Sequence, residues 1–140
     1  MIQRIQTVYL LLGSISVAAP LYIRVWLLHT DAVNPMVDVI VQIVAGLTAA
    51  TALAVIFLHS DRSKQYRLTL VIQVLTLLVI VAMLSVLYLS GNLPGVSTTP
   101  VVSATFAVVL LPFLAYVFFF LARRAINKDI QLVKSMDRLR

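Results

Sequence analysis

Four long apolar runs occupy most of this chain and constrain its fold more than any other feature. They extend over about residues 5–28, 35–59, 68–89 and 100–121. A helical run of about 20 apolar residues matches the roughly 30 Å hydrocarbon core of a bilayer. With 61% hydrophobic residues and a mean hydropathy of +1.04, the chain is too apolar for a soluble domain of 140 residues. We therefore predict an all-α bundle of four transmembrane helices.

Basic residues lie almost entirely on one side of this predicted bundle. Ten cations against three Asp give that side +7, whereas Arg24, Asp31 and Asp38 give the other side −1. Lys and Arg accumulate in short cytoplasmic loops, so both termini are predicted to be cytoplasmic. The excess favours a membrane surface over nucleic acid as the partner. The basic residues on the predicted cytoplasmic side are Arg4, Arg62, Lys64, Arg67, Arg123, Arg124, Lys128, Lys134, Arg138 and Arg140.

Two of the predicted helices begin with a capping residue followed by proline, at Asn34–Pro35 and Thr99–Pro100. Asp38 falls in the first turns of the second helix, where the positive end of the helix dipole favours a carboxylate. An ion or proton relay is the alternative role for Asp38, because ionisable groups near the membrane interior are functional candidates. Pro112, near the middle of the fourth run, predicts a kink.

Small residues repeat along the second run. Gly46, Ala50 and Ala54 recur every four residues, and Ala45 with Ala49 forms a neighbouring pair on nearly the same face. Small residues let helix backbones approach closely in lipid, so we expect the face of Gly46, Ala50 and Ala54 to be the tightest packing face of the bundle. The same face is equally suited to a partner protein.

The chain changes character after residue 121, and residues 122–140 are predicted to form a basic amphipathic cytoplasmic helix that continues from the four-span part, residues 1–121. Ala122, Ile126, Ile130, Val133 and Met136 share one face at helical spacing, with cations opposite. Such a helix can lie on anionic lipid or offer its apolar face to a protein, unless its cations serve only to orient the chain. The residues expected to bind anionic lipid headgroups or a partner are Arg62, Lys64, Arg67, Arg123, Arg124, Lys128, Lys134 and Arg138.

Residue chemistry argues against an enzyme. The chain has no Cys, and its two His residues, His29 and His59, end antiparallel runs on opposite faces, roughly 30 Å apart. They are thus not expected to share a haem. Ser residues in the runs lack a His or carboxylate at the same depth to act as a base. We expect no catalytic residues, no metal and no cofactor.

Three segments resemble a known family. The opening MIQRIQTVYLLL, the central DRSKQYRL and the closing LARRAINKDIQLVKSMDRLR are similar to the DUF4293 family, small membrane proteins of Bacteroidetes-type bacteria. The resemblance covers the whole four-span layout and implies a multi-pass protein of the bacterial cytoplasmic membrane. It implies no activity and no catalytic residue. All three segments belong to the predicted cytoplasmic side.

Two functions remain open. The first is a non-enzymatic accessory or scaffold subunit of a membrane complex, supported by the small-residue face and the amphipathic tail. The second is a small transporter or channel acting as an oligomer, supported by Pro112, Asp38, Gln42 and Gln73. Gln42 and Gln73 lie near opposite interfaces, so we do not expect them to pair. A transporter predicts polar groups converging on one cavity near the midplane, whereas a subunit predicts a dry bundle.

Overall fold

The computed structural model describes residues 2–23, 35–57, 62–89 and 102–137, and these residues form four helices. Each helix corresponds to one of the four apolar runs. The helices are α1 (Ile2–Ile23), α2 (Pro35–Phe57), α3 (Arg62–Leu89) and α4 (Val102–Asp137).

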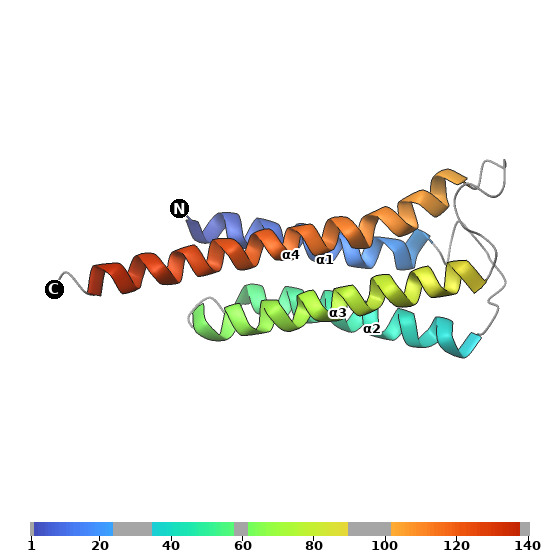
Figure 1. The fold of residues 1–140 in the computed structure, drawn as a ribbon, viewed down its shortest axis with the longest axis horizontal. Helices are drawn as coiled ribbons and strands as arrows, with labels where there is room; N and C mark the ends of the chain where they lie inside the picture. Colours follow the sequence, from blue (N-terminus) through green and yellow to red (C-terminus); the bar gives the residue numbers. More distant parts are fainter. Residues whose placement is uncertain (1, 24–34, 58–61, 90–101, 138–140) are drawn as a thin grey trace.

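The helices run up and down along one long axis (Figure 1). Each packs against the next in sequence, and α1 also packs along α4, so that the four close into a ring. The contact between α1 and α4 is the most extensive of the four. As a result α1 begins, and α4 ends, at the same end of the bundle as the start of α3 (Figure 1). We call this end of the bundle the basic end. The other end, where α2 begins, is called the opposite end.

The outward surface of the bundle is apolar, and several residues inside it are polar. All four helices are long and apolar enough to cross a membrane. On α2, Ile40, Ile43 and Leu47 are exposed, while Thr48 is completely buried. Soluble proteins show the reverse pattern, whereas lipid tails favour apolar groups outside and polar groups inside. The prediction of four candidate membrane spans in an all-α bundle is thus confirmed.

Small residues of α2 are buried in the core of the bundle, but they are not the residues of the predicted face. The core of the bundle includes Ala45, Ala49 and Ala52 of α2. Ala50 and Ala54 are exposed, and a Cβ atom at Gly46 would have nothing within 4 Å. Within the described chain, the stripe of Gly46, Ala50 and Ala54 therefore does not pack closely against another helix, and its use as a packing face toward a partner stays a prediction. The buried face of α2 is instead the adjacent one, which carries Val41, Ala45, Thr48, Ala49, Ala52 and Val55 at helical spacing.

α4 contains two positions at which the sequence predicted a change: a kink at Pro112 and the start of the amphipathic tail after residue 121. The helix continues through Pro112, which is fully buried. It also continues past residue 121. Beyond that residue the helix is still packed, because Ala122 belongs to the core and Ile126 is 1% exposed. The packed part of α4 therefore reaches beyond the predicted start of the amphipathic tail, and the last turns extend past the other helices (Figure 1).

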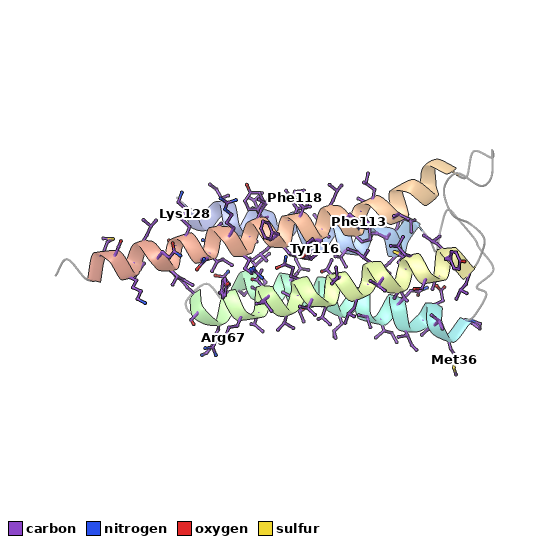
Figure 2. All side chains as sticks on the ribbon, in the orientation of Figure 1. Met36, Arg67, Phe113, Tyr116, Phe118 and Lys128 are labelled. Atoms are coloured by element: carbon purple, nitrogen blue, oxygen red, sulfur yellow. The ribbon has the colours of Figure 1, made fainter. Side chains whose placement is uncertain are left out.

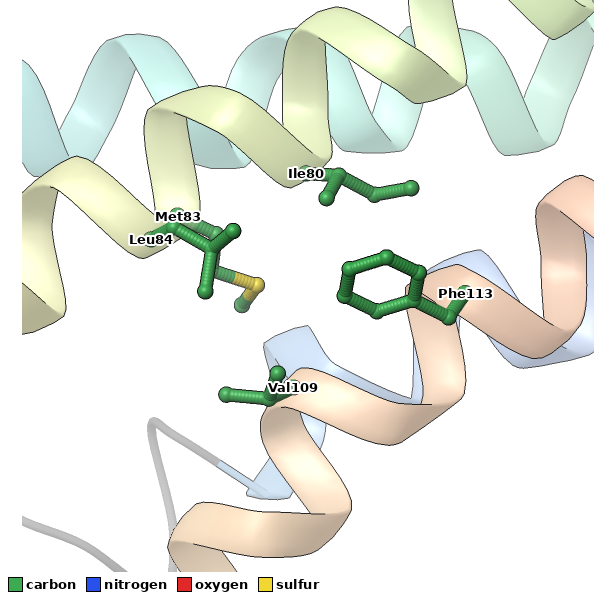
Figure 3. A pocket seen from close by; sticks show the side chains of 5 residues that line it. All are labelled: Ile80, Met83, Leu84, Val109 and Phe113. Carbon is green, nitrogen blue, oxygen red and sulfur yellow. The ribbon is translucent and has the colours of Figure 1, made fainter. Parts of the chain in front are cut away.

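The opposite end of the α3–α4 contact is dry and apolar. The ring of Phe113 on α4 points toward Ile80 and Met83 of α3, with Val109 and Leu84 beside it (Figure 3). The space between these side chains leaves no room for a water molecule. Dispersion contacts between these five side chains hold the two helices together here.

Candidate functional site at the basic end of the bundle

The described Lys and Arg side chains gather at the basic end. They come from the first turns of α3 and the second half of α4, which the antiparallel packing brings together. Arg67 and Lys128 lie toward this end, whereas Met36 lies at the opposite end (Figure 2). The described cations are Arg62, Lys64, Arg67, Arg123, Arg124, Lys128 and Lys134.

One cation is neutralised within the chain. The Nη1 atom of Arg62 on α3 lies 2.8 Å from the Oδ2 atom of Asp129 on α4. The side chains are 35% and 13% exposed, so the pair is partly shielded from solvent. A charge-assisted hydrogen bond of this length joins the start of α3 to α4 beyond residue 121. Arg62 is thus part of the packing as well as of the basic surface.

A second cation, Arg123, is held against α3. Its Nη1 atom donates a hydrogen bond of 3.1 Å to the Oε1 atom of Gln73. Its guanidinium carbon lies 5.8 Å from the centre of the Tyr66 ring, within range of a cation–π contact. Side chains tilt toward the N-terminus of their helix, so Arg123 and Gln73 lean toward each other on antiparallel helices.

The other predicted binding residues differ in their surroundings. Lys64 is exposed and has a partner within the chain, whereas Arg138 lies outside the described residues. Arg67, Arg124, Lys128 and Lys134 are exposed, and no described carboxylate forms an ion pair with them. These four cations are the ones that face an outside anion most freely.

A polar face on α3 is the feature that the sequence analysis missed. Gln65, Thr69, Gln73 and Thr76 are all buried, and their spacing of four, four and three residues places them on one face. Thr69 and Thr76 donate hydrogen bonds to carbonyls of their own helix, at Gln65 and Ile72. The spacing of these four residues is visible in the sequence. They stand within a mostly apolar run, however, and the length of that run indicated only a membrane span.

Two amides near the basic end behave differently. Gln65 donates a hydrogen bond of 3.4 Å to the carbonyl of Val55, one of the last carbonyls of α2, which lack partners in their own helix. Gln6 of α1 is only 4% exposed, and its Nε2 atom has no hydrogen-bond partner among the described residues.

Gln42 of α2 donates a hydrogen bond of 3.4 Å to Asp38, whereas Gln73 accepts one from Arg123. Gln42 and Gln73 thus have separate partners, as expected.

Two adjoining hollows open along the α3–α4 contact at the basic end. The larger, of about 270 Å³, is lined mainly by Leu70, Val74, Leu77 and Phe120, with Gln73 and Arg123 at its polar part. The smaller, of about 140 Å³, is lined by Tyr66, Phe120, Arg123, Arg124 and Asn127. Phe120 and Arg123 line both, so the hollows adjoin, and we call the two together the groove. A separate hollow of about 290 Å³ between α1 and α4 includes Arg124 and Lys128.

The described side chains at this end are chemically complementary to an anion. Within the described ranges, no group of three His, Asp or Glu side chains is placed to hold a metal ion. His29 and His59, for which a shared haem was considered, lie outside the described residues. Guanidinium and ammonium groups beside aromatic and apolar side chains suit a phosphate or carboxylate attached to an apolar body.

Four membrane-length helices with an apolar surface, polar groups inside and cations gathered at one end define a multi-pass membrane protein of the small helical-bundle class. The chain belongs to the DUF4293 family, a domain of unknown function, whose family model matches residues 2–139. The resemblance seen in the three basic segments is thus confirmed. No curated protein and no solved structure matches the chain.

Proposed function

We propose that this chain is a four-span protein of the bacterial cytoplasmic membrane, with both termini cytoplasmic, and that it acts as a non-enzymatic accessory or scaffold subunit of a membrane complex. The end of α4 carries this proposal. Every described residue from 131 to 136 is exposed, including Leu132, Val133 and Met136, of which Met136 is 71% exposed. An apolar face beyond the end of the bundle requires a surface to cover it.

The charge at the basic end supports the cytoplasmic orientation. The described cations share this end, and Asp38 is the described carboxylate at the start of α2, at the opposite end. Short basic segments remain on the cytoplasmic side during insertion, and the inner leaflet is anionic. With this orientation Lys134 and the exposed apolar side chains of the tail face the cytoplasm or its lipid surface.

The tail provides a direct test of the subunit proposal. The native protein is gently solubilised, and the proteins that remain bound in stoichiometric amount are identified by mass spectrometry. We expect a recurrent partner that is lost from a Val133→Ser, Met136→Ser double variant. A Gln131→Ala, Ser135→Ala variant, altered on the same exposed segment, should retain it. Retention of the partner by the first variant, or no stoichiometric partner at all, would contradict the proposal.

Transport by an oligomer is the second candidate function, and the polar face of α3 favours it. Gln65, Thr69 and Gln73 lie in the half of α3 nearer the basic end and Thr76 lies at its middle, whereas Met83 lies in the apolar half. Because the chain has no Cys, single Cys residues at positions 69, 76 and 83 can be probed cleanly. A small water-soluble thiol reagent that modifies all three would indicate a water path and favour transport; protection at 83 would favour the dry bundle of a subunit.

A further inference from the structure

We propose that the groove between α3 and α4 binds one anionic phospholipid of the cytoplasmic leaflet, with the lipid phosphate against Arg123 and Arg124 and an acyl chain in the apolar part. This inference rests on the proposed placement in the membrane, and it is independent of the scaffold role. The groove combines a mainly apolar hollow with an adjoining, more polar one, and Phe120 and Arg123 line both. A phospholipid has the same order of polar and apolar parts.

The polar part of the groove has N–H donors available for an anion. Arg123 carries five N–H donors, and its described hydrogen bond, to Gln73, uses one of them. Arg124 is exposed and lines the same hollow as Asn127. Neither arginine forms an ion pair with a described carboxylate. Two unneutralised guanidinium groups beside one hollow complement a phosphodiester, which accepts several charge-assisted hydrogen bonds.

The position of Arg123 is set in advance. Gln73 is 6% exposed and holds one edge of the guanidinium, while the Tyr66 ring lies against it at 5.8 Å. A side chain already ordered in the free protein loses less conformational entropy on binding. Arg124 lines both this groove and the α1–α4 hollow, but the second cation of the α1–α4 hollow is Lys128, for which no such contact is described. The ordered Arg123 therefore favours the α3–α4 groove.

The apolar part of the groove continues into the membrane. Leu70, Val74 and Leu77 follow one another over seven residues of α3, about 10 Å along the helix axis. Gln73 lies five residues beyond Leu68, where the apolar run begins, so it is about 7.5 Å inside that boundary. A free phosphate has nothing to bury along this stretch, whereas the upper part of an acyl chain fits it.

Native mass spectrometry of the full chain in detergent, titrated with palmitoyl-oleoyl phosphatidylglycerol, tests the proposal. We expect one lipid to be retained, with palmitoyl-oleoyl phosphatidylcholine retained about tenfold less. Arg123→Gln should lower retention about tenfold, the scale of one lost hydrogen bond to a charged group. Val74→Trp fills the groove and keeps every cation, and it should lower retention similarly.

Val81→Trp is the matched control, because it places the same large side chain at an exposed position of α3 that lines neither hollow of the groove, and it should leave retention unchanged. Equal thermal unfolding of all variants shows that the fold is intact. Three outcomes would overturn the proposal: unchanged retention in Val74→Trp, an equal loss in Val81→Trp, or displacement of the lipid by millimolar inorganic phosphate. The partner experiment on Val133 and Met136 has a separate readout, so failure of one leaves the other interpretable.

Discussion

Gly13 of α1 lies against the ring of Phe119 on α4 so closely that a Cβ atom at residue 13 would be 2.5 Å from the Cε1 atom of the ring. Phe119 is completely buried, and its neighbours in the core include Leu10 and Ala115. The absence of a side chain at Gly13 therefore permits the most extensive helix contact of the bundle.

Replacing this glycine has a clear expected effect. Gly13→Ala should destabilise the bundle by about 1–3 kcal/mol, because the ring of Phe119 cannot move without disturbing a filled core. Gly46→Ala is the matched control, since the new methyl group meets nothing within 4 Å and alanine favours the helix by up to about 1 kcal/mol. The midpoint of thermal unfolding in detergent should fall for Gly13→Ala and rise for Gly46→Ala. Equal stability of Gly13→Ala and the unmodified chain would contradict the close packing.

The ion pair between Arg62 and Asp129 predicts coupling between α3 and α4. Asp129→Asn should cost about 1 kcal/mol of unfolding free energy, because the pair is only partly exposed. Exchanging the charges, with Arg62→Asp and Asp129→Arg together, should recover part of the loss. A double-mutant cycle measures the coupling. Lys134→Gln serves as a charge control, and a coupling near zero would show that the contact does not stabilise the bundle.

The unpaired amide of Gln6 predicts a stabilising substitution. Its Nε2 atom is buried without a described partner, which carries a desolvation cost of about 1–3 kcal/mol. Gln6→Met has a similar length and no donor, so it should raise the unfolding midpoint. Gln65→Met should lower it, because the hydrogen bond to the carbonyl of Val55 is lost. A destabilised Gln6→Met variant would mean that the amide is paired in the folded protein.

The proposed orientation is open to a labelling experiment in intact cells. The chain contains no Cys, so Met36→Cys and Ser63→Cys each introduce one thiol at an exposed position. A membrane-impermeant maleimide added from outside should label position 36, at the outer end, but not position 63. After the cells are permeabilised, both should react. Labelling of position 63 in intact cells would reverse the predicted orientation.

The four helices were predictable because apolar run length is a property of the local sequence. Pro35 opens α2 as the Asn34–Pro35 pair predicted, α3 covers the third run, and α4 covers the fourth from Val102 onward. The predicted start at Thr99–Pro100 lies outside the described residues. The boundaries at the basic end were less predictable. α3 begins at Arg62, six residues before the apolar run, because contacts with α2 and α4 hold its polar first turns.

The sequence predicted which basic residues belong to the candidate site, but not which residues they contact. Arg62, Arg123 and Arg124 were grouped as one basic surface, yet Arg62 pairs with Asp129 and Arg123 contacts Gln73 and Tyr66. These partners are far apart in the sequence, and only the antiparallel packing of α3 and α4 brings them within bonding distance. The groove between the helices arises from the same packing.

Local sequence alone determined that this protein has four membrane-length helices and cations at one end, because hydrophobic length and charge position need no partner in space. The tertiary structure decided which small residues are buried and which cations stay free. Gly13 rather than Gly46 makes the close contact, since the contact depends on the facing ring of Phe119. A helix face acquires its role from the surface opposite it, and that surface comes from elsewhere in the chain.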